Sequence, residues 1–357
     1  MGADFPAEVD KSLNALIKGC ITTTIAYNQY SCYNNSIISC IGYKRDVGEK
    51  KRSGVMKMQE GKLPYSTFGY ITICKFMNKM KPFGKKYTWN EGIFANLFTK
   101  FAVNTIGRSD NIDDLLLDKF DWEEDALTIQ FASTKSDQAG EITTDRKRLF
   151  ANPYKPEICT ILSLSIHTWC TRRSSTDECK FLFNGINQDT RYYQILTHTL
   201  EEIDPGINLG CERDSFGTHS NRKFGETITM AHIDGGTRVM VLQRAGQSQG
   251  GVQDRYAFPT ADGDALVGRT AALLNMDCDQ FDVLPCHFGP DTLQELYMYG
   301  WENILPGYQY MPPSFQRTIP FLFATLVYHH HNGDIENLFS REHPIYQQNV
   351  FLDRTWS

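Results

Sequence analysis

The sequence predicts a mainly α-helical fold that contains one small β-hairpin or sheet, of α+β class. Apolar residues recur at helical spacing in most segments after residue 89. One short segment, residues 125–134, alternates apolar and polar residues as a strand does. With 357 residues, 41% of them hydrophobic, the chain can bury a sizeable core, and its length indicates two or three domains.

The expected elements follow in chain order. Residues 89–107, "WNEGIFANLFTKFAVNTIG", predict a buried helix, and residues 111–120, "NIDDLLLDKF", a second one. The strand "DALTIQFAST" leads into a polar turn, "KSDQAGE", so we expect a hairpin there. Three further segments predict helices: "PEICTILSLSIHTWC", "TRYYQILTHTLEEI" and "THSNRKFGETITMAH".

The front of the chain is segregated by charge. A short helix is expected around Val9–Ile17, and residues 19–43 contain no charged residue, which indicates an insertion of low order. Residues 44–86 contain twelve Lys and Arg against three acids, a local charge of +9 in a chain whose net charge is −6. Such a run is commonly only a solvated face, but it also fits contacts to DNA phosphates. The candidate DNA-binding residues are Lys44, Arg45, Lys50, Lys51, Arg52, Lys85 and Lys86.

The sequence does not support a secreted, membrane-spanning or metal-binding protein. The first residues carry acids and no apolar core of a secretory signal, and the run "TIPFLFATLVYHHH" is too short to span a bilayer. Ten cysteines without a CxxC pair predict buried thiols in a reducing, intracellular compartment. His329, His330 and His331 favour a solvated helix end over a metal site, and we expect neither a metal nor a cofactor.

Six residues form an ordered series of candidates for catalysis. Arg108 is followed 27 residues later by Lys135, at the tip of the expected hairpin. His219 and Arg222 form an HxxR pair one turn apart on one helix face. Gln247, in a Gly-Gln-Ser turn, comes 25 residues after Arg222, and Tyr256 comes nine residues after Gln247. Each residue alone is unremarkable in type, but the order and the spacing are specific.

This series resembles that of the tyrosine recombinases, the phage-integrase superfamily: Arg, Lys, HxxR, a His or Trp, and a nucleophilic Tyr. The resemblance covers about residues 89–258. Four segments look like the crypton-type recombinases of eukaryotic DNA transposons: "GRSDNIDDLLLDKFDWEEDALTIQFASTKSDQAGE", "FANPYKPEICTILSL", "GTHSNRKFGETI" and "RAGQSQGGVQDRYAF". Gln247 departs from the pattern, since the family has His or Trp at this place.

The resemblance implies a reaction without metal or ATP. Two guanidiniums, Arg108 and Arg222, would grip the non-bridging oxygens of a DNA phosphate. His219 would take the phenolic proton of Tyr256, Lys135 would protonate the leaving 5′ oxygen, and a 3′-phosphotyrosyl bond would form. The Gly250–Gly251 pair ahead of Tyr256 would supply a hinge.

The resemblance also implies an organisation and partners. Residues 1–88 would form a helical, basic, partial core-binding region, residues 89–260 the tyrosine-recombinase catalytic domain, and residues 261–357 a C-terminal extension. The expected partner is double-stranded DNA in the nucleus, with a homotetramer on two DNA sites and no membrane. Because of Gln247, a transposon-derived DNA-binding protein with weak or no activity stays open. A type IB topoisomerase shares the catalytic set but has large clamp domains that find no counterpart here.

Overall fold

The computed structural model describes residues 61–84, 87–132, 146–232, 235–249 and 258–348. Contacts divide the chain into residues 1–61 and residues 62–357, and everything described below belongs to the second unit apart from Gly61. Several residues singled out in the sequence lie outside the described residues: the 19–43 segment, Lys44, Arg45, Lys50, Lys51, Arg52, Lys85, Lys86, Lys135 and Tyr256.

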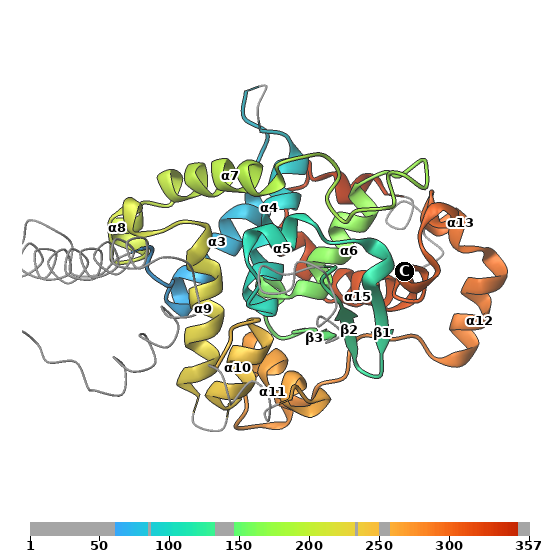
Figure 1. Cartoon of the computed structure of the whole chain (residues 1–357). Helices are drawn as coiled ribbons and strands as arrows, with labels where there is room; N and C mark the ends of the chain where they lie inside the picture. The colour runs from blue at the N-terminus through green and yellow to red at the C-terminus, as the bar shows by residue number, and fades with distance from the viewer. Residues whose placement is uncertain (1–60, 85–86, 133–145, 233–234, 250–257, 349–357) are drawn as a thin grey trace, which may run out of the picture. The chain divides into compact units, whose positions relative to one another are not determined.

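The described residues confirm the predicted class: they are mainly helical, with one small three-stranded antiparallel sheet (Figure 1). The helices are α3 (Thr67–Lys79), α4 (Trp89–Thr105), α5 (Ser109–Asp113), α6 (Thr160–Cys170), α7 (Gln188–Glu202), α8 (Pro205–Asn208), α9 (Thr218–Ala231), α10 (Arg238–Arg244), α11 (Ala261–Ala271), α12 (Pro290–Tyr299), α13 (Trp301–Ile304), α14 (Pro313–Gln316), α15 (Ile319–His331) and α16 (Asp334–Leu338). The strands are β1 (Phe120–Glu123), β2 (Ala126–Ile129) and β3 (Lys147–Leu149).

Helix α4 lies at the centre of this unit and packs against α3, α6, α7 and α9. Its start is capped, because the backbone N–H of Thr88 donates to Glu91 Oε2 over 2.9 Å. Every residue from Gly92 to Thr105 is buried, so only the first turn of this helix meets solvent. It ends at Ile106, whose φ of 53° is left-handed. The helix predicted over residues 89–107 is confirmed.

The sheet confirms the predicted strand and corrects the helix expected before it. β2 pairs with β1 on one side and β3 on the other, with Leu127 opposite Trp122 and Leu149. The segment 111–120 is not one helix: α5 ends at Asp113, and β1 begins at Phe120. Between them, Leu115 and Leu117 exchange backbone hydrogen bonds with residues 180–182, so a distant segment overrides the local helical pattern.

Residues after 261 share the core of the preceding segment. α15 packs against α6, and the rings of Phe323 and Trp169 stack with centroids 5.8 Å apart. α14 packs on β1, where the Phe315 ring meets Phe120 edge-on at 5.7 Å. Burial of such aromatic surface is a main source of stability in a domain of this size. The C-terminal part therefore contributes to the core that supports α4 and the sheet.

The histidines at the end of α15 do not all face solvent, which corrects the expectation of a solvated helix end. His329 is fully buried, and its Nδ1 lies 2.7 Å from Asp334 Oδ2. His330 and His331 are exposed, as expected. No three His, Cys, Asp or Glu side chains in the described ranges gather as metal ligands would. No helix in those ranges combines the length and the apolar character needed to cross a bilayer.

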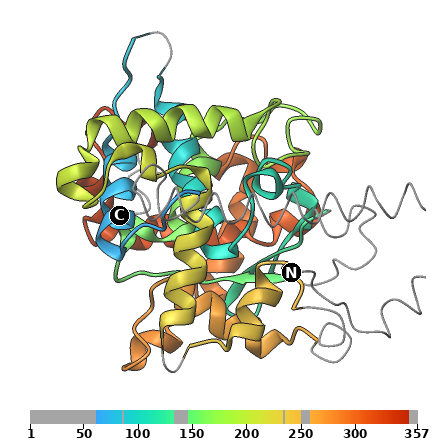
Figure 2. The same cartoon turned by 60° about the vertical axis from the view of Figure 1, so that its left-hand side comes forward.

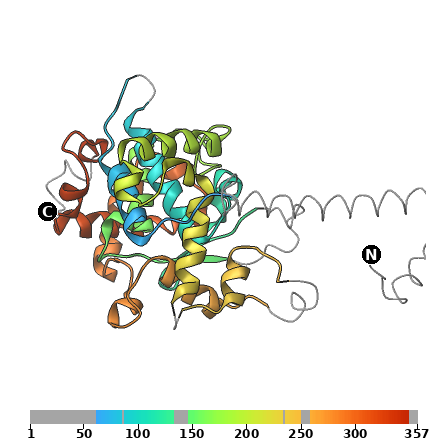
Figure 3. The ribbon, with the colours of Figure 1, turned by 90° about the vertical axis from the view of Figure 1, so that its left-hand side faces the viewer.

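Helix α9 approaches α4 closely and ends beside α10 and α11, as Figure 2 shows. The close approach depends on Gly225, since a Cβ there would lie 2.5 Å from the carbonyl oxygen of Val103. Helix α7 crosses α3 and α4 on another side of the core (Figure 3). Packing of α9 on the buried central helix fixes the face on which the HxxR pair lies.

Candidate phosphodiester-binding site

The HxxR pair lies on α9, one turn apart, as the sequence predicts. His219 is exposed, and Arg222 is half-buried. The same helix turns Phe224 and Gly225 toward the core. The helix thus holds a partly desolvated guanidinium and a solvent-accessible imidazole on a rigid support.

Arg108 lies where α4 ends and α5 begins, and it is the N-cap residue of α5. Burial lowers the pKa of Arg222, and the positive charge of Arg108 lowers it further. The two guanidiniums are therefore close enough to repel each other. Paired cations that repel in the free protein form a natural site for an anion, since a bound anion removes the repulsion.

Two acidic residues partly offset the positive charge of Arg108 and Arg222. Glu226, one turn after Arg222 on α9, and Asp110, in the first turn of α5, both act to raise the pKa of Arg222. Asp110 is exposed and Glu226 is half-buried. Glu226 is thus a carboxylate held next to the guanidinium that we expect to bind phosphate.

The turn after α10 brings Gln247 to the same place. Gly246 has a left-handed φ of 62°, and the backbone N–H of Gln247 donates to the carbonyl oxygen of Leu242 over 2.9 Å. The Gln247 side chain donates from Nε2 to Glu226 Oε1 over 3.0 Å. Arg222 donates from Nη2 to the carbonyl oxygen of Ala245 over 2.8 Å. Two hydrogen bonds therefore tie α9 to this turn.

The end of α10 is held from beneath by a buried arginine. The Arg244 side chain is fully buried, and its guanidinium donates to the carbonyl oxygens of Asn104 and Arg148, each over 2.7 Å. It also forms an ion pair with Asp264 of α11, while Lys147 donates to the Arg244 carbonyl oxygen. Because these partners come from α4, β3 and α11, the buried contacts of Arg244 hold the turn with Gln247 in a fixed position.

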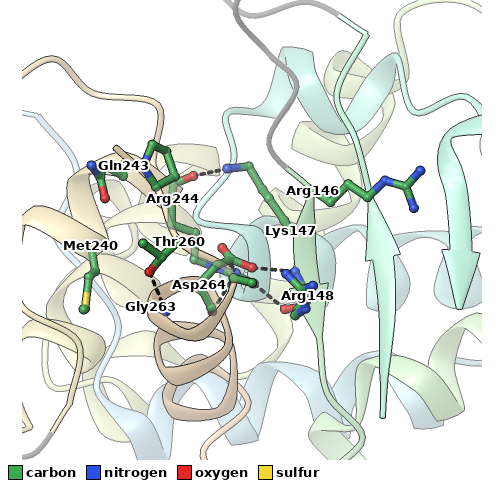
Figure 4. A pocket seen from close by; sticks show the side chains of 11 residues that line it. Arg146, Lys147, Arg148, Met240, Gln243, Arg244, Thr260, Gly263 and Asp264 are labelled. Carbon is green, nitrogen blue, oxygen red and sulfur yellow. Dashed lines mark hydrogen bonds and ion pairs between the residues drawn. The ribbon is translucent and has the colours of Figure 1, made fainter. Parts of the chain in front are cut away.

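A pocket of about 150 Å³ lies beside Arg244, between β3, α10 and α11 (Figure 4). Three consecutive cations line it, Arg146, Lys147 and Arg148, but each is used within the protein. Arg146 and Arg148 pair with Glu123, and Lys147 binds the Arg244 carbonyl oxygen. The pocket is therefore part of the support and not a second anion site.

The described part of the basic region pairs with acids elsewhere in the protein. Lys75 lies 3.3 Å from Glu157, and Lys81 lies 3.1 Å from Glu342. Both lysines are more than half exposed, so these pairs add little stability. The local excess of positive charge is thus partly matched across the fold.

The structure brings together Arg108, Arg222 and Gln247 among the candidates, and it places His219 on the same helix as Arg222. In the sequence, Lys135 comes after β2 and before β3, and Tyr256 comes after α10 and before α11; both are outside the described residues. Sequence reasoning missed Glu226. Its position carried a signal, because a residue four positions after Arg222 on one helix shares a face with it.

Comparison with known proteins gives one kind of match. The sequence matches no protein-family model and no curated protein. In fold, the chain is similar to a Flp recombinase–Holliday junction complex, at 12% identity and a TM-score of 0.40, over 86% of this chain and 70% of that one. It is also similar to a Flpe–Holliday junction complex, at 11% identity and a TM-score of 0.47, over 82% and 72%. A complex of a Flpe mutant with Holliday junction DNA is similar at 11% identity and a TM-score of 0.48, over 82% of this chain and 72% of that one.

Proposed function

We propose that this protein cleaves and rejoins DNA strands through a 3′-phosphotyrosyl intermediate, as a tyrosine recombinase of crypton-like type. The observation that supports this most is the pair of mutually repelling guanidiniums, Arg108 and Arg222, beside the HxxR helix. A guanidinium offers a forked pair of donors, and two of them suit the two non-bridging oxygens of a phosphodiester. Negative charge that grows on those oxygens during attack would be stabilised by groups already in place.

The proposed step forms a bond between phosphorus and the Tyr256 oxygen and breaks the bond between phosphorus and the 5′ oxygen. His219 accepts the phenolic proton, and Lys135 gives a proton to the leaving 5′ oxygen. The phosphotyrosyl bond retains the energy of the phosphodiester, so attack by a 5′ hydroxyl reverses the step without ATP. The exposure of His219 supports its role, because a buried imidazole would be out of reach of an incoming nucleophile.

The chain length allows Tyr256 to reach this site. Tyr256 is the ninth residue after Gln247, which contacts α9, and an extended chain spans about 3.3–3.6 Å per residue, or about 30 Å in all. Phe258, two residues after Tyr256, is 72% exposed, so the chain returns to the fold at the surface.

A second candidate is a transposon-derived protein that binds DNA but cleaves it weakly or not at all. One observation favours it: one amide donor of Gln247 is engaged by Glu226, in a place where the family presents an imidazole or indole. A type IB topoisomerase is the third reading of the same residues. Under the first two candidates we expect double-stranded DNA as partner, a tetramer on two sites, and action in the nucleus.

Suicide-nicked duplex DNA tests the proposal. Attack on such a substrate releases a short strand, so the covalent adduct accumulates and migrates slowly on a denaturing gel. We expect an adduct with the wild-type chain and none with Tyr256→Phe, which removes only the hydroxyl and should bind DNA nearly as well. DNA binding without adduct in the wild type would favour the inactive candidate, and an adduct in Tyr256→Phe would exclude Tyr256 as the nucleophile.

A further inference from the structure

Glu226 is an acid at a site for an anion, and this placement needs a physical reason. It lies one turn after Arg222 and opposes the effect of Arg108 on the Arg222 pKa. A carboxylate beside a bound phosphate repels it, and the repulsion is strong where water is partly excluded. Neutralising the arginine pair in the free protein is one reason, but exposed Asp110 already acts in that sense.

The contact with Gln247 supplies a second reason. Glu226 Oε1 accepts from Gln247 Nε2 over 3.0 Å, while the Gln247 backbone is fixed by the turn that follows α10. A carboxamide has two N–H donors on one planar group, so a partner on one of them fixes the direction of the other. Among the described residues, none accepts the second N–H of Gln247.

We propose that Glu226 is a positioning residue, which holds the Gln247 carboxamide so that its second N–H donates to a non-bridging oxygen of the DNA phosphate. The pair would replace the single imidazole or indole donor that the resembling family has at this place. This inference rests on the proposed function and deepens it. It also accounts for an acid at the phosphate site, because an ionised acceptor orients an amide more strongly than a neutral one does.

A double-mutant cycle on the rate of adduct formation tests the inference. Gln247→Ala and Glu226→Ala should each lower the rate at saturating DNA about tenfold or more, and the double variant should be no slower than either one. Glu226→Gln keeps an oxygen acceptor but loses the negative charge, so its rate should lie between those of Glu226→Ala and the wild type. Glu295→Ala, which removes an exposed acid of α12, is the matched control and should leave the rate unchanged.

DNA affinity separates positioning from damage to the fold. Glu226→Ala removes a negative charge near the phosphate, so it should bind DNA as tightly as the wild type or more tightly. Loss of binding together with rate would mean a structural role and overturn the inference, as would single effects that multiply in the double variant. Gln247→Trp should not exceed the wild-type rate; a clear gain would show that the amide is only a weak substitute for an indole.

A second measurement decides the inference if the wild type forms no adduct, an outcome that would by itself reject the proposed function. In a ¹⁵N-labelled chain, the side-chain amide signal of Gln247 is identified by its loss in Gln247→Ala. We expect the chemical shifts of its two amide protons to differ widely in the wild type. They should approach the values of an ordinary exposed glutamine in Glu226→Ala, and they should change on addition of inorganic phosphate. An exposed-type signal in the wild type, or one that ignores phosphate, would overturn the positioning role.

Discussion

Arg222 Nη2 donates to the carbonyl oxygen of Ala245 over 2.8 Å, and this bond joins the HxxR helix to the turn that holds Gln247. A guanidinium has five donors, so it can keep this bond and still present others to a phosphate. A lysine has a single point of donation and cannot do both with the same geometry.

The first prediction follows from that bond. Arg222→Lys should lower adduct formation by about 10²–10³, the usual loss when one donor to a developing charge is removed. DNA affinity should fall much less, because the charge is kept. Rates from suicide-nicked DNA and affinities from titration check this. A rate within a few fold of wild type would show that the guanidinium does not grip the reacting phosphate.

The second prediction concerns the basic region. Neutralising Lys50, Lys51 and Arg52 together should weaken binding to all DNA sequences about equally. The slope of log K against log salt should become less steep by about 0.9 for each DNA phosphate that these side chains no longer neutralise.

Lys75→Gln and Lys81→Gln are the matched controls, because both lysines pair with acids of the fold. They should change the salt slope less than the triple variant does. An unchanged slope in the triple variant would mean that residues 50–52 are only a solvated face.

The third prediction concerns the buried ion pair between Arg244 and Asp264, which supports the site. Asp264→Ala leaves the fully buried Arg244 guanidinium without its ionic partner, and it should lower the free energy of unfolding by about 3–5 kcal/mol. Glu201→Ala removes the exposed partner of Arg213 and should cost about 1 kcal/mol or less. Urea denaturation of both variants checks this, and equal losses would contradict the role of Arg244 as a buried support.

The fourth prediction concerns pH. Burial lowers the pKa of His343 to about 4, and its Nδ1 accepts the backbone N–H of Ile345 over 3.2 Å. The unfolded chain has a histidine pKa of about 6.5, so the unfolded state binds the proton first on acidification. The stabilising contribution is complete above pH 6.5 and is lost as pH falls toward 4.

His343→Asn keeps a cap acceptor but does not titrate, so it isolates this contribution. Between pH 7.5 and pH 5 the wild type should lose about 2 kcal/mol more of its free energy of unfolding than the variant does. His167, whose pKa burial lowers to about 3, titrates in both proteins and cancels in the difference. Parallel pH curves for the two proteins would show that His343 is not a buried neutral cap.

Local sequence patterns identified the elements that depend on local spacing. The helices α4, α6, α7 and α9 and the strand β2 were predicted within a few residues, because their apolar spacing agrees with the way they are buried. The helix predicted over residues 111–120 was wrong, since backbone hydrogen bonds with residues 180–182 outweigh a helical pattern of apolar residues. The prediction that His329 faces solvent was also wrong. Its side chain is buried in the core beside Asp334, and that burial comes from tertiary packing.

The sequence alone determined the helical class, the central buried helix and the serial order Arg108, His219, Arg222 and Gln247, since these depend on spacing along one chain. Only the tertiary structure decided which charges meet. The repulsion between Arg108 and Arg222 and the bond from Gln247 to Glu226 join segments many residues apart. Electrostatic and hydrogen-bond energies depend on distance in space and on burial, and packing of α9 against α4 and of α10 against α9 and α11 sets both.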